Sequence, residues 1–121
     1  MGDSRPLGAR TLLLVEESAV IGLDLADNFE HEGYEVAGPF SCEVALTWVE
    51  SATPDLAVLD VHLQSGFCVR LVRELQRRGV PLVVHSSYNQ IHALSEFQNL
   101  PWVQMPAAFS EVASALSRLC R

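Results

Sequence analysis

The sequence has few positive charges and no long apolar segment. Its 121 residues include eight Lys plus Arg against fifteen Asp plus Glu, which gives a formal net charge of −7. This imbalance opposes binding to a phosphate backbone, so we expect no direct nucleic-acid partner. No apolar stretch approaches the roughly 20 residues of a membrane helix, and the opening residues lack the apolar core of a signal peptide. We therefore expect a cytoplasmic protein with no membrane partner.

Several motifs that mark common sites are also missing. The three cysteines, Cys42, Cys68 and Cys120, are far apart and include no CxxC, so we expect reduced thiols rather than a disulfide framework or a zinc site. The sequence has no HExxH, no GxSxG and no GxGxxG after its first apolar run. An aspartyl phosphatase usually has a second acid two residues after its nucleophile, but Val61 and His62 follow Asp60. We expect that the protein is not an enzyme.

What is present is an alternation of short apolar runs with helical patterns. The hydrophobic fraction of 49% and the charged fraction of 19% fit a globular protein. We expect a flexible tail over residues 1–10 and one domain over 11–121. Strands are predicted at 11–15, 34–38, 56–60, 82–85 and 101–104, and helices at 18–33, 41–50, 66–78, 87–98 and 109–120. Strands separated by helices pair in parallel, so the fold class is α/β, a doubly wound (βα)5 domain.

The helical spacing also predicts which side chains face the core. Ser18 and Ser41 are the expected N-caps of the first two helices, and Gly33 ends the first. The predicted inward positions are Val20, Ile21, Leu23, Leu25 and Phe29 in the first helix, Val44, Ala45, Trp48 and Val49 in the second, and Phe67, Val69, Leu71, Val72 and Leu75 in the third.

Acidic side chains follow two of the predicted strands. Glu16 and Glu17 end the first apolar run, and Asp60 ends the run Leu56 to Leu59. In a parallel sheet these ends share one edge, where ligands bind in doubly wound folds. Three carboxylates there would suit Mg²⁺, which prefers oxygen ligands. Glu16 and Glu17 could instead complement the dipole of the following helix, and Ser86 and Ser87 after the fourth strand could be helix caps.

The order of these segments resembles the receiver domain of two-component response regulators (CheY-like), across nearly the whole chain. Five segments carry the resemblance: Leu13-Leu14-Val15-Glu16-Glu17, Gly33-Tyr34-Glu35-Val36, Pro54 to Leu63 around Asp60, Val83-Val84-His85-Ser86-Ser87-Tyr88, and Trp102-Val103-Gln104-Met105-Pro106. The resemblance implies a flavodoxin-like, five-stranded sheet of order 2-1-3-4-5. It also suggests a cis peptide bond between Met105 and Pro106.

The resemblance assigns roles to particular residues. It implies that Asp60 accepts a phosphoryl group from a sensor histidine kinase or a phosphotransfer protein. Glu16, Glu17, Asp60 and the backbone carbonyl of His62 would bind Mg²⁺, the Ser86 hydroxyl would contact the phosphoryl group, and Trp102 would be the switch aromatic. The implied output is binding of a downstream partner, or homodimerisation, through the face formed by the fourth helix, fifth strand and fifth helix.

Three departures separate this chain from the receiver pattern. Met105 stands where receivers carry lysine, Glu17 stands where the metal-binding acid is usually aspartate, and Gly66 comes earlier than usual after Asp60. The lysine would normally pair with the acceptor aspartate, so its loss leaves like charges close together. Two interpretations follow: a stand-alone atypical receiver in a phosphorelay, or a pseudo-receiver adaptor that binds partner proteins without phosphotransfer.

Overall fold

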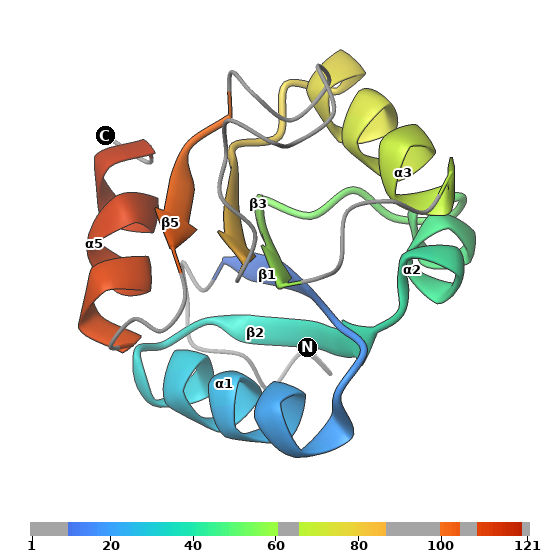
Figure 1. The fold of residues 1–121 in the computed structure, drawn as a ribbon. Helices are drawn as coiled ribbons and strands as arrows, with labels where there is room; N and C mark the ends of the chain where they lie inside the picture. The colour runs from blue at the N-terminus through green and yellow to red at the C-terminus, as the bar shows by residue number, and fades with distance from the viewer. Residues whose placement is uncertain (1–9, 61–65, 87–99, 105–108, 120–121) are drawn as a thin grey trace, which may run out of the picture.

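The chain forms a parallel sheet with helices on both faces (Figure 1). The computed structural model describes residues 10–60, 66–86, 100–104 and 109–119. Its strands are β1 (Thr11–Glu16), β2 (Glu35–Phe40), β3 (Leu56–Asp60), β4 (Leu82–Ser86) and β5 (Trp102–Gln104), in the order β2-β1-β3-β4-β5. Its helices are α1 (Ala19–His31), α2 (Cys42–Val49), α3 (Gly66–Arg77) and α5 (Phe109–Leu119). The predicted parallel α/β fold is confirmed. Residues 1–9 and the helix expected over 87–98 lie outside the described residues.

Two apolar layers cover the two faces of the sheet. On one face, Leu12 and Leu14 pack with the buried side chains of α1 and α5. On the other, Leu13 and Val15 pack with the buried side chains of α2 and α3. These four residues of β1 are fully buried, as expected for a strand covered on both sides. In the described part of the chain, no helix combines the length and apolarity needed to cross a membrane.

The inward face of α1 differs from the predicted one. The buried positions are Gly22, Leu25, Ala26 and Phe29, at helical spacing, whereas Val20, Ile21 and Leu23 are exposed. Two of the buried positions are small because the helix lies close to the sheet. The predicted inward positions Val44 of α2 and Phe67 of α3 are also exposed. The predicted N-caps are confirmed: the hydroxyls of Ser18 and Ser41 accept hydrogen bonds from the Ile21 and Val44 amides.

Strand β2 continues past the point where the sequence predicts its end. It runs through Pro39 to Phe40, and its pairing with β1 shifts register between Leu13 and Val15. The Gly38–Pro39 peptide bond is cis, whereas Met105 and Pro106 lie outside the described residues. Pro39 is tolerated because β2 is an edge strand and the irregular pairing spares its missing N–H.

A disulfide joins Cys42, the first residue of α2, to Cys68 in the first turn of α3. The prediction of reduced thiols is therefore wrong for these two residues. Both cysteines are buried in the same apolar layer, and their Cα atoms are 5.1 Å apart. Sequence spacing could not show this pair, because the packing of two helices on one sheet face brings the cysteines together. The bond connects α2 to the helix that follows the segment after Asp60.

Reduction of this disulfide is expected to destabilise the fold. The bonded residues are 26 positions apart, and closing a loop of this length in the unfolded chain is worth about 3.5 kcal/mol. Dithiothreitol should therefore lower the urea midpoint of the wild type. The variant Cys42→Ala/Cys68→Ala should show no such response. An equal effect of dithiothreitol on both proteins would contradict the cross-link.

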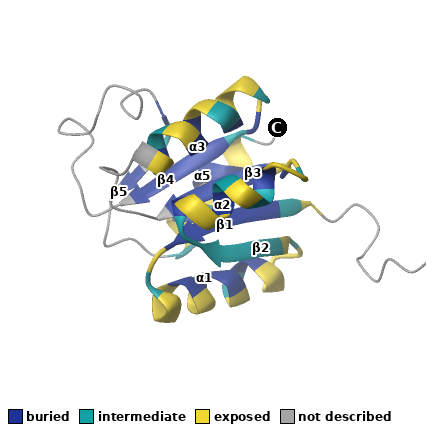
Figure 2. Cartoon of the chain, turned by 90° about the vertical axis from the view of Figure 1, so that its right-hand side faces the viewer, coloured by how far each residue is buried: buried dark blue, intermediate teal, exposed yellow. Residues whose placement is uncertain are grey.

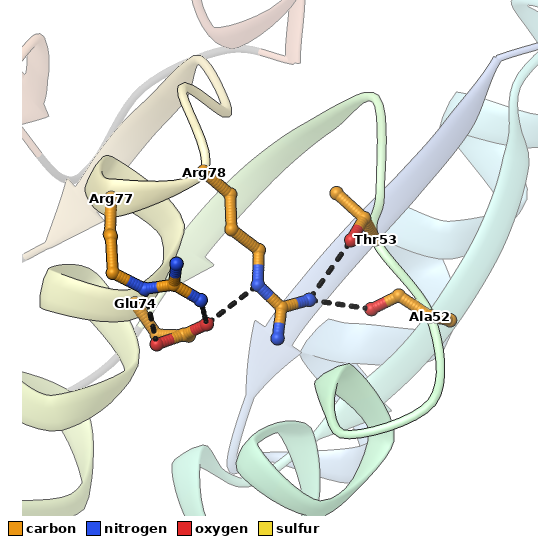
Figure 3. Close-up of polar contacts among 5 residues, drawn as sticks. All are labelled: Ala52, Thr53, Glu74, Arg77 and Arg78. Atoms are coloured by element: carbon orange, nitrogen blue, oxygen red, sulfur yellow. Dashed lines mark hydrogen bonds and ion pairs between the residues drawn. The ribbon is translucent and has the colours of Figure 1, made fainter.

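Arg78 connects the end of α3 to the loop before β3, and Glu74 pairs with both Arg78 and Arg77 (Figure 3). Arg78 Nε donates a hydrogen bond to Glu74 Oε2 at 2.6 Å. Its Nη1 donates to the Ala52 carbonyl at 3.0 Å and to the Thr53 hydroxyl at 2.9 Å. Arg77 also donates to both oxygens of Glu74. The hydrogen bonds from Arg77 and Arg78 lower the pKa of Glu74 from 4.5 to about 2.

The lowered pKa of Glu74 makes its contribution to stability depend on pH. The contribution is fully present above the unfolded-state pKa of 4.5 and is lost as the pH falls through the folded-state value of about 2. Between pH 5 and 2 we therefore expect the stability difference between the wild type and Glu74→Gln to shrink. Urea unfolding across this range measures it, with the exposed Glu50→Gln as control for the lost charge. A constant difference would show that the ion pairs add nothing.

Candidate functional site

The acids predicted to meet at one sheet edge come from neighbouring strands. β1 and β3 are paired in parallel, and Glu16 lies opposite Asp60 in the register. Both residues end their strands, so they lie at the carboxyl edge of the sheet. Glu17 follows Glu16 directly and is exposed. The backbone therefore places Glu16, Glu17 and Asp60 at the edge where ligands bind in doubly wound folds.

Glu16 helps to fix the turn between β1 and α1. Its side chain is 7% exposed, and its Oε1 accepts a hydrogen bond from the Ser18 amide at 2.8 Å. Ser18 then caps α1, and its carbonyl accepts from the Gly22 amide at 2.8 Å. One oxygen of this buried acid is thus engaged by the backbone, which holds the carboxylate near the start of α1.

Gly22 allows α1 to lie close to this turn, a role that the sequence analysis did not identify. A Cβ on Gly22 would stand 2.5 Å from Cβ of Pro39 and 3.2 Å from Cγ of Glu16. A residue larger than glycine would therefore push α1 away from both β2 and the buried acid. The available sequence signal is that Gly22 shares its helical face with Leu25, Ala26 and Phe29.

Ser86 lies at the same edge, one strand further along. It ends β4, while the strand pairing aligns Leu59 with Val84 and Ser86 with Gln104. Trp102 begins β5 and lies opposite Val84 of β4. Its backbone is therefore two residues before the end of β5 at Gln104. His85, the residue before Ser86 in β4, is buried at 6% exposure.

Three predicted residues lie outside the described residues: His62, Met105 and Pro106. For the described residues, the donor set fits Mg²⁺ in its chemistry, because Glu16, Glu17 and Asp60 supply carboxylate oxygens. Within that part of the chain, no three His, Cys, Asp or Glu side chains form a group that could hold a metal ion. The structure thus places the backbones of the three acidic residues at one edge of the sheet.

Comparison with curated proteins finds distant sequence similarity to a transcriptional regulatory protein. No family model matches the chain. The transcriptional regulatory protein PdtaR of Mycobacterium tuberculosis (strain ATCC 25618 / H37Rv) is 31% identical over 83 residues, which are 67% of this chain and 40% of PdtaR. The chain therefore spans less than half the length of this curated relative.

Solved structures resemble the chain over nearly its full length. A response regulator receiver protein from Sinorhizobium medicae WSM419 has a TM-score of 0.78 at 20% identity, covering 94% of this chain and 96% of that one. The response regulator TrrA from Thermotoga maritima, in complex with Mg²⁺ and BeF, has a TM-score of 0.77 at 19% identity, with coverages of 91% and 98%. The chemotaxis response regulator CheY4 of Vibrio cholerae has a TM-score of 0.77 at 19% identity, covering 92% of this chain and 98% of that one. The chain has the fold of response regulator receiver domains, as its sequence motifs predict.

Proposed function

We propose that the chain is an atypical receiver domain that accepts a phosphoryl group on Asp60 and thereby switches protein–protein interactions. The observation that carries this proposal is the register of β1 and β3, which sets Glu16 beside Asp60 at the carboxyl edge of a receiver fold. On this proposal the protein acts in two-component signalling in the cytoplasm and is not a metabolic enzyme. Its donor is a phosphohistidine on a sensor kinase or phosphotransfer protein.

The chemistry follows from the residue types at this edge. A carboxylate oxygen of Asp60 attacks phosphorus while the bond from phosphorus to the donor's imidazole nitrogen breaks, and the nitrogen keeps the electron pair. Mg²⁺, when bound, supplies positive charge for the phosphoryl oxygens. Glu16, Glu17, Asp60 and the His62 carbonyl would hold the ion. The Ser86 hydroxyl would donate to a phosphoryl oxygen, and Trp102 would relay the change towards β5 and α5.

A second candidate is an adaptor that binds partners without phosphotransfer. Two observations favour it: Met105 replaces the lysine of the receiver pattern, and one oxygen of Glu16 already accepts the Ser18 amide. Without a fixed cation, the acids at this edge repel one another and the incoming phosphoryl group.

Intact mass after incubation with acetyl phosphate and millimolar Mg²⁺ separates the two candidates. The phosphoryl-acceptor proposal predicts that the mass rises by one phosphoryl group. The same incubation with a Mg²⁺ chelator present from the start should leave the mass unchanged. An unchanged mass in the incubation without the chelator would overturn the proposal and leave the adaptor.

A further inference from the structure

The outer sides of α1 and α3 carry stripes of opposite charge. On α3, Arg70, Arg73 and Arg77 are exposed and follow one another at intervals of three and four residues, so they share one side of the helix. On α1, an exposed acidic stripe consists of Asp24, Asp27 and Glu30. The basic stripe is notable because the whole chain has only eight Lys plus Arg.

Large apolar side chains are exposed within the first two turns of the same two helices. Val20 and Leu23 are 81% and 62% exposed at the start of α1, before the acidic stripe. Phe67 is 41% exposed at the start of α3, before the basic stripe. Apolar side chains gathered beside complementary charges are typical of protein-interaction surfaces.

The two stripes cannot pair within one molecule. α1 packs on the sheet face that it shares with α5, whereas α3 packs on the opposite face with α2. Figures 1 and 2 show the two helices on opposite sides of the sheet, with exposed residues along their outer sides. The acidic stripe can therefore meet a basic stripe of this kind only on another molecule.

We propose that the chain associates with itself head to tail, with the acidic stripe of α1 in one copy against the basic stripe of α3 in the next. The helices would lie side by side in the same direction. This direction sets Val20 and Leu23 against Phe67 while it sets the acids against the arginines; the reverse direction would set apolar groups against charges. The two stripes also match in length. Asp24 and Glu30 are six residues apart, which is about 9 Å along an α-helix, and Arg70 and Arg77 are seven residues apart, which is about 10.5 Å.

The contact is heterologous, so one α1 stripe and one α3 stripe stay available at the ends of each assembly. Further copies can then add, which gives open chains or a closed ring. This mode of association differs from a homodimer through the face of β5 and α5, and it requires no phosphorylation of Asp60. Its test is therefore independent of the proposed function.

The association is expected to be weak, because exposed ion pairs contribute little individually. Charges of both stripes also have partners within the chain. Among them, Arg77 pairs with Glu74, and Asp27 Oδ1 lies 3.7 Å from His31 Nδ1. The net charge of −7 repels whole molecules, but about 0.15 M salt screens charges beyond roughly 8 Å and leaves closer pairs less affected. The contact should thus appear at high protein concentration in moderate salt.

Sedimentation velocity from micromolar to millimolar protein, in about 0.15 M salt, tests the proposal. The wild type should show a sedimentation coefficient that rises with concentration. Reversal of either stripe, by Arg70→Glu/Arg73→Glu or by Asp24→Arg/Asp27→Arg, should weaken the association at least about tenfold. The variant with all four substitutions should associate again, because its stripes are again complementary. Circular dichroism would check that each variant is folded.

The matched control is Arg10→Glu/Arg118→Glu, which changes the net charge as much as the α3 reversal but alters exposed arginines outside both stripes. It should associate like the wild type. A wild type that stays monomeric at millimolar concentration would overturn the proposal, as would a fourfold variant that fails to recover or a control that weakens as much as the stripe reversals. Heparin binding through Arg70 and Arg73 by a monomeric wild type would also overturn it and identify a polyanion site.

Discussion

Asp60→Asn is expected to abolish the gain of one phosphoryl group when the chain is incubated with acetyl phosphate and Mg²⁺. The amide is similar in size to the carboxylate, but its oxygen is a far weaker nucleophile and carries no charge for a cation to balance. Because β3 is buried between β1 and β4, replacing its last residue leaves the apolar part of the strand unchanged. The loss should therefore be complete while the fold persists.

Asp55→Asn is the matched control for this substitution. Asp55 precedes β3 at the opposite edge of the sheet, where its Oδ2 accepts a hydrogen bond from the Thr11 amide at 2.8 Å. An asparagine oxygen can still accept that bond. We expect Asp55→Asn to be phosphorylated like the wild type. Equal phosphorylation of the Asp60→Asn variant would place the acceptor elsewhere and contradict the assignment.

Gly38→Ala is expected to lower the free energy of unfolding by about 4 kcal/mol or more. Losses this large occur mainly where a substitution causes backbone strain or a steric clash. Gly38 has a φ of 126°, a conformation that residues with a Cβ rarely adopt. An added Cβ would also stand 2.3 Å from the carbonyl oxygen of Leu14 in β1. Backbone atoms in a paired strand cannot move away without breaking hydrogen bonds of the sheet, so β2 would have to separate from β1. Urea unfolding of the variant measures the loss.

Gly33→Ala separates the steric clash from the backbone conformation. Gly33 has a φ of 98° after α1, but a Cβ there would meet nothing within 4 Å. Gly33→Ala should therefore lower the free energy of unfolding by only about 1–2 kcal/mol, which is the penalty of a left-handed backbone conformation alone. Similar losses for the two variants would show that close approach of β2 to β1 at Gly38 is not what makes glycine necessary there.

The strands and helix starts could be predicted because local sequence determines them. The apolar run before Asp60 forms a buried strand, and Ser18 and Ser41 cap the helices that they precede. The orientation of α1 could not be predicted in the same way. Its inward stripe contains Gly22 and Ala26, whose burial depends on how closely the helix approaches Pro39 and the sheet. The larger Val20 and Leu23 suggested the wrong face.

The remaining differences arise from contacts between distant segments. Cys42 and Cys68 meet because α2 and α3 pack on one face of the sheet, and Arg78 reaches Ala52 and Thr53 across the same layer. At the site, the rule that parallel strands share a carboxyl edge was sufficient to place Glu16 next to Asp60. It could not show that the Glu16 side chain is buried and bonded to the Ser18 amide.

The central claim is that the edge formed by Glu16, Glu17 and Asp60 receives a phosphoryl group. Its most direct test is the amide NMR spectrum of the chain titrated with beryllofluoride, a phosphoryl mimic, in the presence of Mg²⁺. We predict saturable shifts of the Glu17 and Ser18 amides and of amides at the ends of β3 and β4, all of them missing from the Asp60→Asn variant. An unchanged wild-type spectrum at millimolar Mg²⁺ and beryllofluoride, or equal shifts in the variant, would contradict the claim.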